Sequence, residues 1–134
     1  MAHYCMNCEA AEMVLETRDV TVNYKNLSTV VPGVAGWHCP ACGEIEFTDE
    51  ASSHTHMQAL NELAALHKEQ TKTFIKSTRK KLNLTQAAAS KIFGGGVNAF
   101  SEYERGITQP HPSTLKLLRL LNKHPEMLDE VSNA

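Results

Sequence analysis

Four cysteines are the residues in this sequence whose type and spacing most clearly suggest chemistry. They form two Cys-x-x-Cys pairs, Cys5 with Cys8 and Cys39 with Cys42. A spacing of two residues lets both sulfurs of a pair reach one ion, and Zn²⁺ favours a closed tetrahedron of thiolates. Because four cysteines fill that tetrahedron, the pattern predicts one structural zinc ion per chain. A redox dithiol, or four unrelated thiols, is the alternative interpretation.

Aromatic residues near the two pairs are interpreted mainly as packing residues. His3 and His38 each lie beside a pair, and the alternative ligand set has one of them in place of a cysteine. Trp37 is expected to pack inside a small domain that depends on its metal for stability. A zinc enzyme would need an open metal position with a base beside it, and the sequence offers neither. We therefore predict a protein without catalytic activity.

The second half of the chain has the pattern of a helix-turn-helix. A first helix is predicted from Phe74, Ile75 and Leu82 and is expected to end near Asn83. Thr85 is a good N-cap for a second helix over residues 86–93, and three glycines at 94–96 end that helix. A third helix is expected to follow and to stop at Gly106. In this motif the second helix holds the third so that its first residues reach base edges in the major groove. The alternative is a generic helical bundle.

Eight polar residues are candidates for DNA contact, and they divide into two kinds. On the exposed face of the third helix, an asparagine can bond adenine through two hydrogen bonds and a glutamate can accept one from cytosine. At the start of the second helix, backbone N–H groups and nearby lysines can bind phosphates. The candidates on the third helix are Asn98, Ser101, Glu102 and Arg105, and those for phosphate are Thr85, Gln86, Lys80 and Lys81.

The opposite side of these helices is expected to be small and apolar, because the motif needs close packing. The residues assigned to this inner side are Ala87, Ala88, Ala89, Ile92, Val97, Phe100 and Tyr103. A fourth helix after Pro112 carries leucines at 115, 117, 118, 120 and 121, more than one small core needs. The excess predicts a homodimer formed by the C-terminal domain. Pro125 is expected to start a short fifth helix.

The segment between the cysteine pairs has the pattern of β structure. Val20, Val22 and Tyr24 alternate with polar residues, which is typical of a half-buried strand. Turns are predicted at Lys25-Asn26 and again at Pro32-Gly33, so that separate strands would cover 27–31 and 34–38. A short strand containing Ile45 and Phe47 is expected after the second cysteine pair.

A long helix is expected to follow these strands. Thr48 is a suitable N-cap, and apolar residues recur at helical spacing as far as about Glu69. The polar run at 70–73 predicts a boundary or hinge, with an unbroken helix as the alternative. These elements predict the α+β class: a small zinc-binding β/α domain at 1–69, followed by an all-α helix-turn-helix domain at 70–134.

The charges are divided unevenly between the two halves. Residues 1–67 contain two basic and nine acidic residues, whereas residues 68–134 contain eleven basic and six acidic ones. This asymmetry favours two modules, with nucleic acid as the partner of the basic one. No run approaches the roughly 20 apolar residues that span a membrane, and the first residues lack a signal-peptide pattern. The four cysteines are interpreted as metal ligands rather than disulfides, which suits a compartment where thiols stay reduced. Together these features predict a cytoplasmic protein with no membrane partner.

These motifs resemble those of the MqsA-type antitoxins, which join a YgiT-type zinc finger to an Xre-like helix-turn-helix. Besides the cysteine pairs, the resemblance rests on Arg79-Lys80-Lys81-Leu82-x-Leu84-Thr85-Gln86, on Ile92-Phe93-Gly94-Gly95-Gly96-Val97-Asn98-Ala99-Phe100-Ser101 and on Gln109-Pro110-His111-Pro112-Ser113-Thr114. The resemblance implies that Asn98, matched by motif, would be a base reader. The sequence departs from the family at Glu102, where members carry a basic residue.

The resemblance implies an antitoxin of a type II toxin–antitoxin system. Its zinc domain would bind an MqsR-type toxin, a ribonuclease that cleaves mRNA. Its C-terminal domain would dimerise and repress the shared operon by binding a palindromic double-stranded operator. The alternative function is a stand-alone transcriptional regulator whose four-cysteine site responds to zinc or oxidants.

Overall fold

The computed structural model describes residues 2–134 and divides into two compact units. One unit extends to His67 and the other is Lys68–Ala134. The first contains a three-stranded antiparallel sheet and the start of a long helix, and the second is entirely helical. The predicted α+β class is confirmed. Among the described helices, none is both long enough and apolar enough to cross a membrane.

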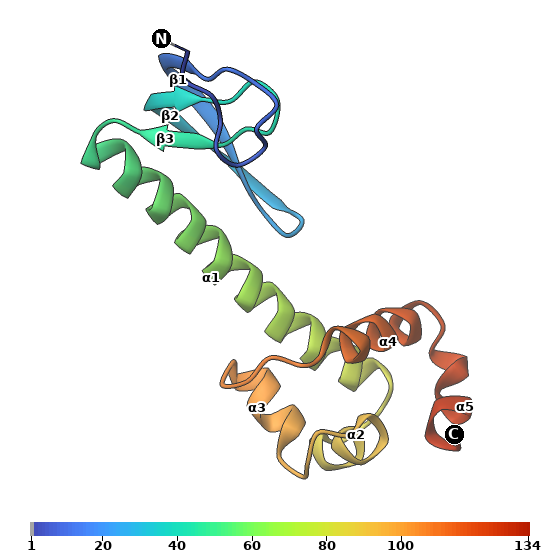
Figure 1. Ribbon diagram of the computed structural model, residues 1–134. Helices are drawn as coiled ribbons and strands as arrows, with labels where there is room; N and C mark the ends of the chain where they lie inside the picture. The colour runs from blue at the N-terminus through green and yellow to red at the C-terminus, as the bar shows by residue number, and fades with distance from the viewer. Residues whose placement is uncertain (1) are drawn as a thin grey trace. The chain divides into compact units, whose positions relative to one another are not determined.

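The sheet of the first unit is built on one hairpin. Strands β1 (Val14–Tyr24) and β2 (Leu27–His38) pair antiparallel and lie side by side, and the short β3 (Ile45–Phe47) pairs with the end of β2 (Figure 1). The predicted turn at Lys25-Asn26 is present, with Tyr24 opposite Leu27 across it.

The turn predicted at Pro32-Gly33 is wrong, because β2 continues through these residues. Arg18 pairs with Val34 but Val20 pairs with Val31, so β2 has one extra residue opposite Asp19. This is a β-bulge, and a bulge tolerates proline, which has no N–H to donate to the ladder. The Gly33 N–H donates to the Asp19 carboxylate at 3.1 Å, and the φ of Gly33 is +63°. The side chain of Asp19 therefore replaces the missing ladder partner.

The long helix α1 covers Glu50–Lys81 without a break. The boundary predicted at 70–73 is absent from it, because polar residues without proline or glycine do not interrupt a helix. The helix begins one residue later than expected from a Thr48 cap. Asp49 accepts a hydrogen bond from the Ser52 N–H, the geometry of an N-cap, and this bond lowers the pKa of Asp49.

The core of the first unit lies between the sheet and the segment of α1 at residues 59–63. Val22, Val31 and Val34 are buried on the strands, and they cluster with Ala59 and Leu63 of the helix. The valines come from both sides of the bulge, so the extra residue in β2 keeps the apolar side chains on one face. This face supports the strand ends that lead to the cysteine pairs.

The second unit contains the end of α1 and four further helices. They are α2 (Gln86–Phe93), α3 (Ala99–Arg105), α4 (Pro112–Lys123) and α5 (Leu128–Ser132), with a 3₁₀ turn at Pro125–Met127 before the last (Figure 1). Its core is a buried cluster contributed by α1, α2, α3 and α4, namely Ile75, Ala89, Phe100 and Leu118.

Two residues assigned to this inner side lie outside it. Ala87 is exposed, and Val97 has 79% of its surface exposed. Val97 precedes the first residue of α3 by two positions, so the helical period that places Phe100 inside does not extend back to it. Ala87 lies on the outer face of α2, because neighbouring positions on a short helix face in different directions.

Candidate metal centre and nucleic-acid interface

The two Cys-x-x-Cys pairs occupy loops of the same local shape. In each, the residue after the second cysteine has a positive φ, +56° at Glu9 and +80° at Gly43. The N–H of that residue donates to the carbonyl of the first cysteine, at 3.0 Å from Glu9 to Cys5 and 3.1 Å from Gly43 to Cys39. Each loop is thus a tight turn that presents two sulfurs on one side.

The turns bring all four sulfurs into one cluster. The Sγ atoms of Cys5, Cys8, Cys39 and Cys42 all lie within 4.8 Å of one another. Sulfurs of different pairs lie 3.6 Å apart for Cys5 and Cys42, and 3.7 Å apart for Cys8 and Cys39. A tetrahedral ion with zinc–sulfur bonds of about 2.3 Å needs sulfurs about 3.8 Å apart. The donor set and its spacing therefore fit the predicted ion, and the cluster can hold a metal.

Two of the four thiols, those of Cys8 and Cys39, differ in how readily they ionise. The backbone N–H of Cys42 donates to the Cys39 sulfur and, together with that of Ala41, lowers the pKa of Cys39 to about 6. The amide of Ala10 acts to lower the pKa of Cys8, but burial and the neighbouring sulfurs outweigh it and raise that pKa to about 11. The thiol of Cys39 therefore ionises before that of Cys8, and metal binding must displace the proton of Cys8 at neutral pH.

The histidines beside the pairs have other partners. The Nε2 atom of His3 lies 2.6 Å from the Glu46 carboxylate, and its ring stacks on Trp37 with centroids 4.1 Å apart. His38 is buried, and its Nε2 donates to the Val34 carbonyl at 3.1 Å. Both rings are thus held by contacts inside the first unit. Trp37 packs on the His3 ring within the first unit, as expected.

In the second unit, α2 begins at the predicted cap. The hydroxyl oxygen of Thr85 accepts a hydrogen bond from the Ala88 N–H at 3.1 Å, and Gln86 is exposed at the first helical position. The buried hydroxyl of Ser90 accepts from the Phe100 N–H at 3.2 Å, which ties α2 to the start of α3. These bonds fix the angle at which α3 leaves the turn.

The glycine turn between α2 and α3 has a backbone conformation that residues with a side chain could adopt only with strain. Gly94, Gly95 and Gly96 have φ values of +83°, +94° and +100°. A Cβ atom on Gly95 would lie 2.9 Å from the Tyr103 hydroxyl oxygen and 3.1 Å from the Cβ of Ala99. The turn therefore brings its backbone close to α3, and Asn98 follows it at the N-cap position.

The four candidates on α3 are exposed to different degrees. Asn98 is exposed, and its side chain makes no capping hydrogen bond to the described backbone. Arg105 is exposed with its Nε donating to the Ser101 carbonyl, while Ser101 itself is half-buried. Glu102 is half-buried, and the Thr108 hydroxyl donates to it at 3.5 Å. The amide of Asn98 is the most available of these groups.

The two candidate lysines before α2 also differ. Lys80 is exposed at the end of α1. The ammonium of Lys81 donates to the Asn122 carbonyl, near the C-terminal end of α4. Cations at that end of a helix are favoured by its dipole, so Lys81 has a structural partner that Lys80 lacks in the described contacts.

Sequence reasoning missed a buried ion pair that joins α1 to α3. Arg79 donates to both carboxylate oxygens of Glu104, each at 2.9 Å, and also to the Leu84 carbonyl. The two side chains are only 12% and 5% exposed. The signal was present in the spacing, because Arg79 and Glu104 each follow a buried residue, Ile75 and Phe100, by one helical turn.

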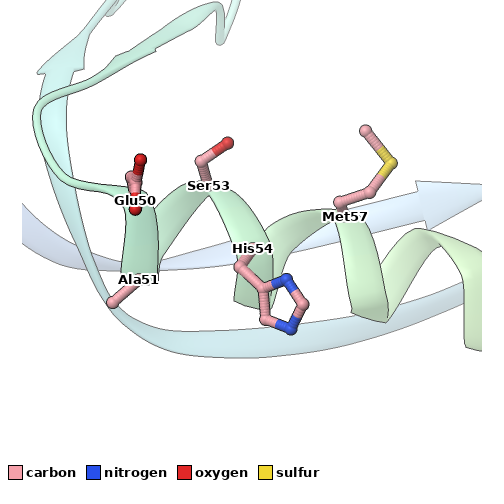
Figure 2. A pocket seen from close by; sticks show the side chains of 5 residues that line it. All are labelled: Glu50, Ala51, Ser53, His54 and Met57. Atoms are coloured by element: carbon pink, nitrogen blue, oxygen red, sulfur yellow. The ribbon is translucent and has the colours of Figure 1, made fainter.

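A surface hollow at the first turns of α1 offers less chemistry. Its lining residues are Glu50, Ala51, Ser53, His54 and Met57. Figure 2 shows that these side chains project in different directions from one helix rather than toward a common point. We assign it no ligand.

The fold and the cysteine cluster define a two-unit protein, with a metal-binding type of site in the first unit and a helical second unit. A sequence model of the antitoxin component of bacterial toxin–antitoxin systems, MqsA, matches residues 3–132. The chain is also similar to Antitoxin MqsA of Escherichia coli (strain K12), at 46% identity over 128 residues, which cover 95% of this chain and 98% of the relative. This chain belongs to the MqsA family of antitoxins.

Proposed function

We propose that this antitoxin neutralises an MqsR-type mRNA-cleaving ribonuclease by binding it, and that it represses its own operon by sequence-specific DNA binding. The observation that carries the proposal is the family match, which spans both units from residue 3 to residue 132. A relative that is 46% identical over 95% of this chain favours a role for both units rather than for one alone. The chain would act in the cytoplasm, as a binding protein without catalytic activity.

The first unit is the proposed toxin-binding part, held by one structural Zn²⁺ on Cys5, Cys8, Cys39 and Cys42. Four thiolates leave a tetrahedral zinc ion no open position, which favours a structural role over a catalytic one. The unit also has the acidic balance that suits a basic, RNA-binding partner, with nine acidic and two basic residues up to His67.

The second unit is the proposed DNA-binding part, with α2, the glycine turn and α3 as a helix-turn-helix. In that arrangement the exposed amide of Asn98 would read an adenine, and Ser101, Glu102 and Arg105 would follow it along the groove. The N-terminus of α2, at Thr85 and Gln86, would meet a phosphate. Lys80 would neutralise another, and Lys81 would contribute less because Asn122 holds it.

We further propose that the second unit forms the homodimer that a palindromic operator requires. The support lies in α4, where Leu118 and Leu121 are fully buried but Leu120 is 44% exposed. The two buried leucines serve the core of one chain, and it is the excess of leucines in α4 beyond these two, rather than the exposure of one, that favours a partner surface.

Purification of the tagged chain from its native host tests the proposed function. We expect an MqsR-type ribonuclease to co-purify at about one copy per chain, and a fragment from upstream of the chain's own gene to bind the complex or the free chain. Recovery of the chain without any ribonuclease, but with binding of that fragment, would favour the stand-alone regulator that senses zinc or oxidants through its cysteines. Of the four, Cys42 is the exposed one that a small oxidant would reach first.

A further inference from the structure

Val97 is an apolar side chain placed in solvent at the start of α3. With 79% of its surface exposed, it exceeds the other exposed large apolar residues described in the second unit, Ile107 at 60% and Leu120 at 44%. Isolated apolar residues are common on protein surfaces, so exposure alone has no meaning. The position of Val97 in the glycine turn, directly before Asn98, separates it from an ordinary surface valine.

The usual structural role for an apolar residue at this position is not possible here. Asn98 is the N-cap of α3, so Val97 is the residue before the cap and Glu102 is the fourth helical residue. An apolar residue before the cap stabilises a helix by packing on an apolar residue at that fourth position. Glu102 presents a carboxylate there, which the Thr108 hydroxyl approaches at 3.5 Å. Neither this staple nor the core of the unit therefore explains Val97.

We propose that Val97 contacts the C5-methyl group of a thymine, in the base pair next to the one that Asn98 contacts. The inference rests on the proposed function of the second unit as a DNA-binding domain. The thymine methyl is the apolar group that bases present in the major groove, and small apolar side chains recognise it. The adjacent amide of Asn98 matches adenine in the same groove. Two neighbouring residues would thus select two neighbouring A·T pairs in each half-site.

The test replaces each thymine of the operator, one at a time, with uracil, which removes only the methyl group. The probe is a duplex from upstream of the chain's own gene, narrowed by footprinting, and the protein is the full chain. For the wild-type chain, uracil at one position per half-site should weaken binding about fourfold, the effect expected from one buried methyl group. Val97→Ala should bind the thymine duplex more weakly and should respond little to uracil at that position.

Two further variants keep the outcome interpretable. Val97→Ser replaces both methyl groups of the side chain with one hydroxyl, and we expect it to lose the uracil response as Val97→Ala does. Ile107→Ala removes a comparable exposed apolar residue after α3 and should keep the wild-type uracil profile. Specific binding with the same profile in wild type and both Val97 variants would overturn the inference alone. If the wild-type chain bound no duplex selectively, the proposed function would fail, and the inference would fail with it.

Discussion

At the scale of single residues, this chain separates groups that can carry sequence information from groups that can only supply charge. The amide of Asn98 has two hydrogen-bonding atoms in a fixed plane and makes no capping bond to the described backbone. Lys80 has a flexible side chain that ends in an ammonium group, and it lies at the end of α1 in the unit with a net positive charge. A bidentate amide distinguishes adenine from the other bases, whereas a phosphate contact is the same at every base pair.

This division predicts different phenotypes for two alanine variants. Asn98→Ala should weaken operator binding by about 1–3 kcal/mol and relax the preference at one base pair per half-site. Lys80→Ala should weaken binding to specific and non-specific duplexes alike, and should reduce the slope of log K against log salt by about 1. Titrations of both variants against operator and scrambled duplexes, at several salt concentrations, measure these effects. Identical behaviour of the two variants in every titration would contradict the division.

At the scale of elements, the orientation of α3 depends on contacts at both of its ends. Ser90 of α2 accepts from the backbone at the start of α3, and Arg79 of α1 pairs with Glu104 near its end. A bidentate pair with both side chains almost fully buried holds a defined geometry. If either partner were removed, the remaining charge would stay buried without its counterpart.

We therefore expect Glu104→Ala to lower the free energy of unfolding of the second unit by about 3–5 kcal/mol, because Arg79 would be left as a buried charge. The matched control is Glu69→Ala, which removes the exposed partner of Lys72 and should cost at most about 1 kcal/mol. Urea unfolding of the full chain followed by far-UV circular dichroism measures both. The fluorescence of Trp37, the single tryptophan, reports on the first unit and should change little in either variant. Equal costs for the two variants would show that the buried pair has no special role.

Local sequence signals predicted the elements best where capping and periodicity act alone. The Thr85 cap and the Gly106 stop were predicted because each depends on one residue and its near neighbours. The bulge at Pro32-Gly33 was not, because it depends on the carboxylate of Asp19 fourteen residues away. The buried pair of Arg79 and Glu104 was not predicted for the same reason, because the fold brings these two residues together from different helices.

The candidate site divides in the same way. Cysteine spacing predicted the cluster of four sulfurs, because each pair forms within one tight turn and only the two turns have to come together. The helical periodicity of α3 could not predict the outward position of Val97, because Val97 lies two residues before the first residue of that helix. The partner that holds Lys81 lies forty-one residues further along the chain. Long-range contacts therefore decide which polar candidates remain exposed for the proposed DNA contact.

At the scale of the whole molecule, the two units have different chemistry and opposite charge. Residues up to 67 are acidic and contain the four-cysteine cluster, whereas residues 68–134 are basic and contain no cysteine. Each unit also has a core of its own. The core of the first unit contains Val22 and two other valines, and the core of the second unit contains Phe100. Because neither core includes residues of the other unit, we expect each task to survive a local lesion in the opposite unit.

The most direct test of this account measures both tasks in the same two variants of the full chain. Cys39→Ser should bind less than the expected one zinc per chain by elemental analysis and should no longer inhibit mRNA cleavage by an MqsR-type ribonuclease from the same host, while still binding the operator. Asn98→Ala should inhibit the ribonuclease fully while binding the operator about 1–3 kcal/mol more weakly. Loss of both activities together in either variant, or full zinc content in Cys39→Ser, would contradict the account.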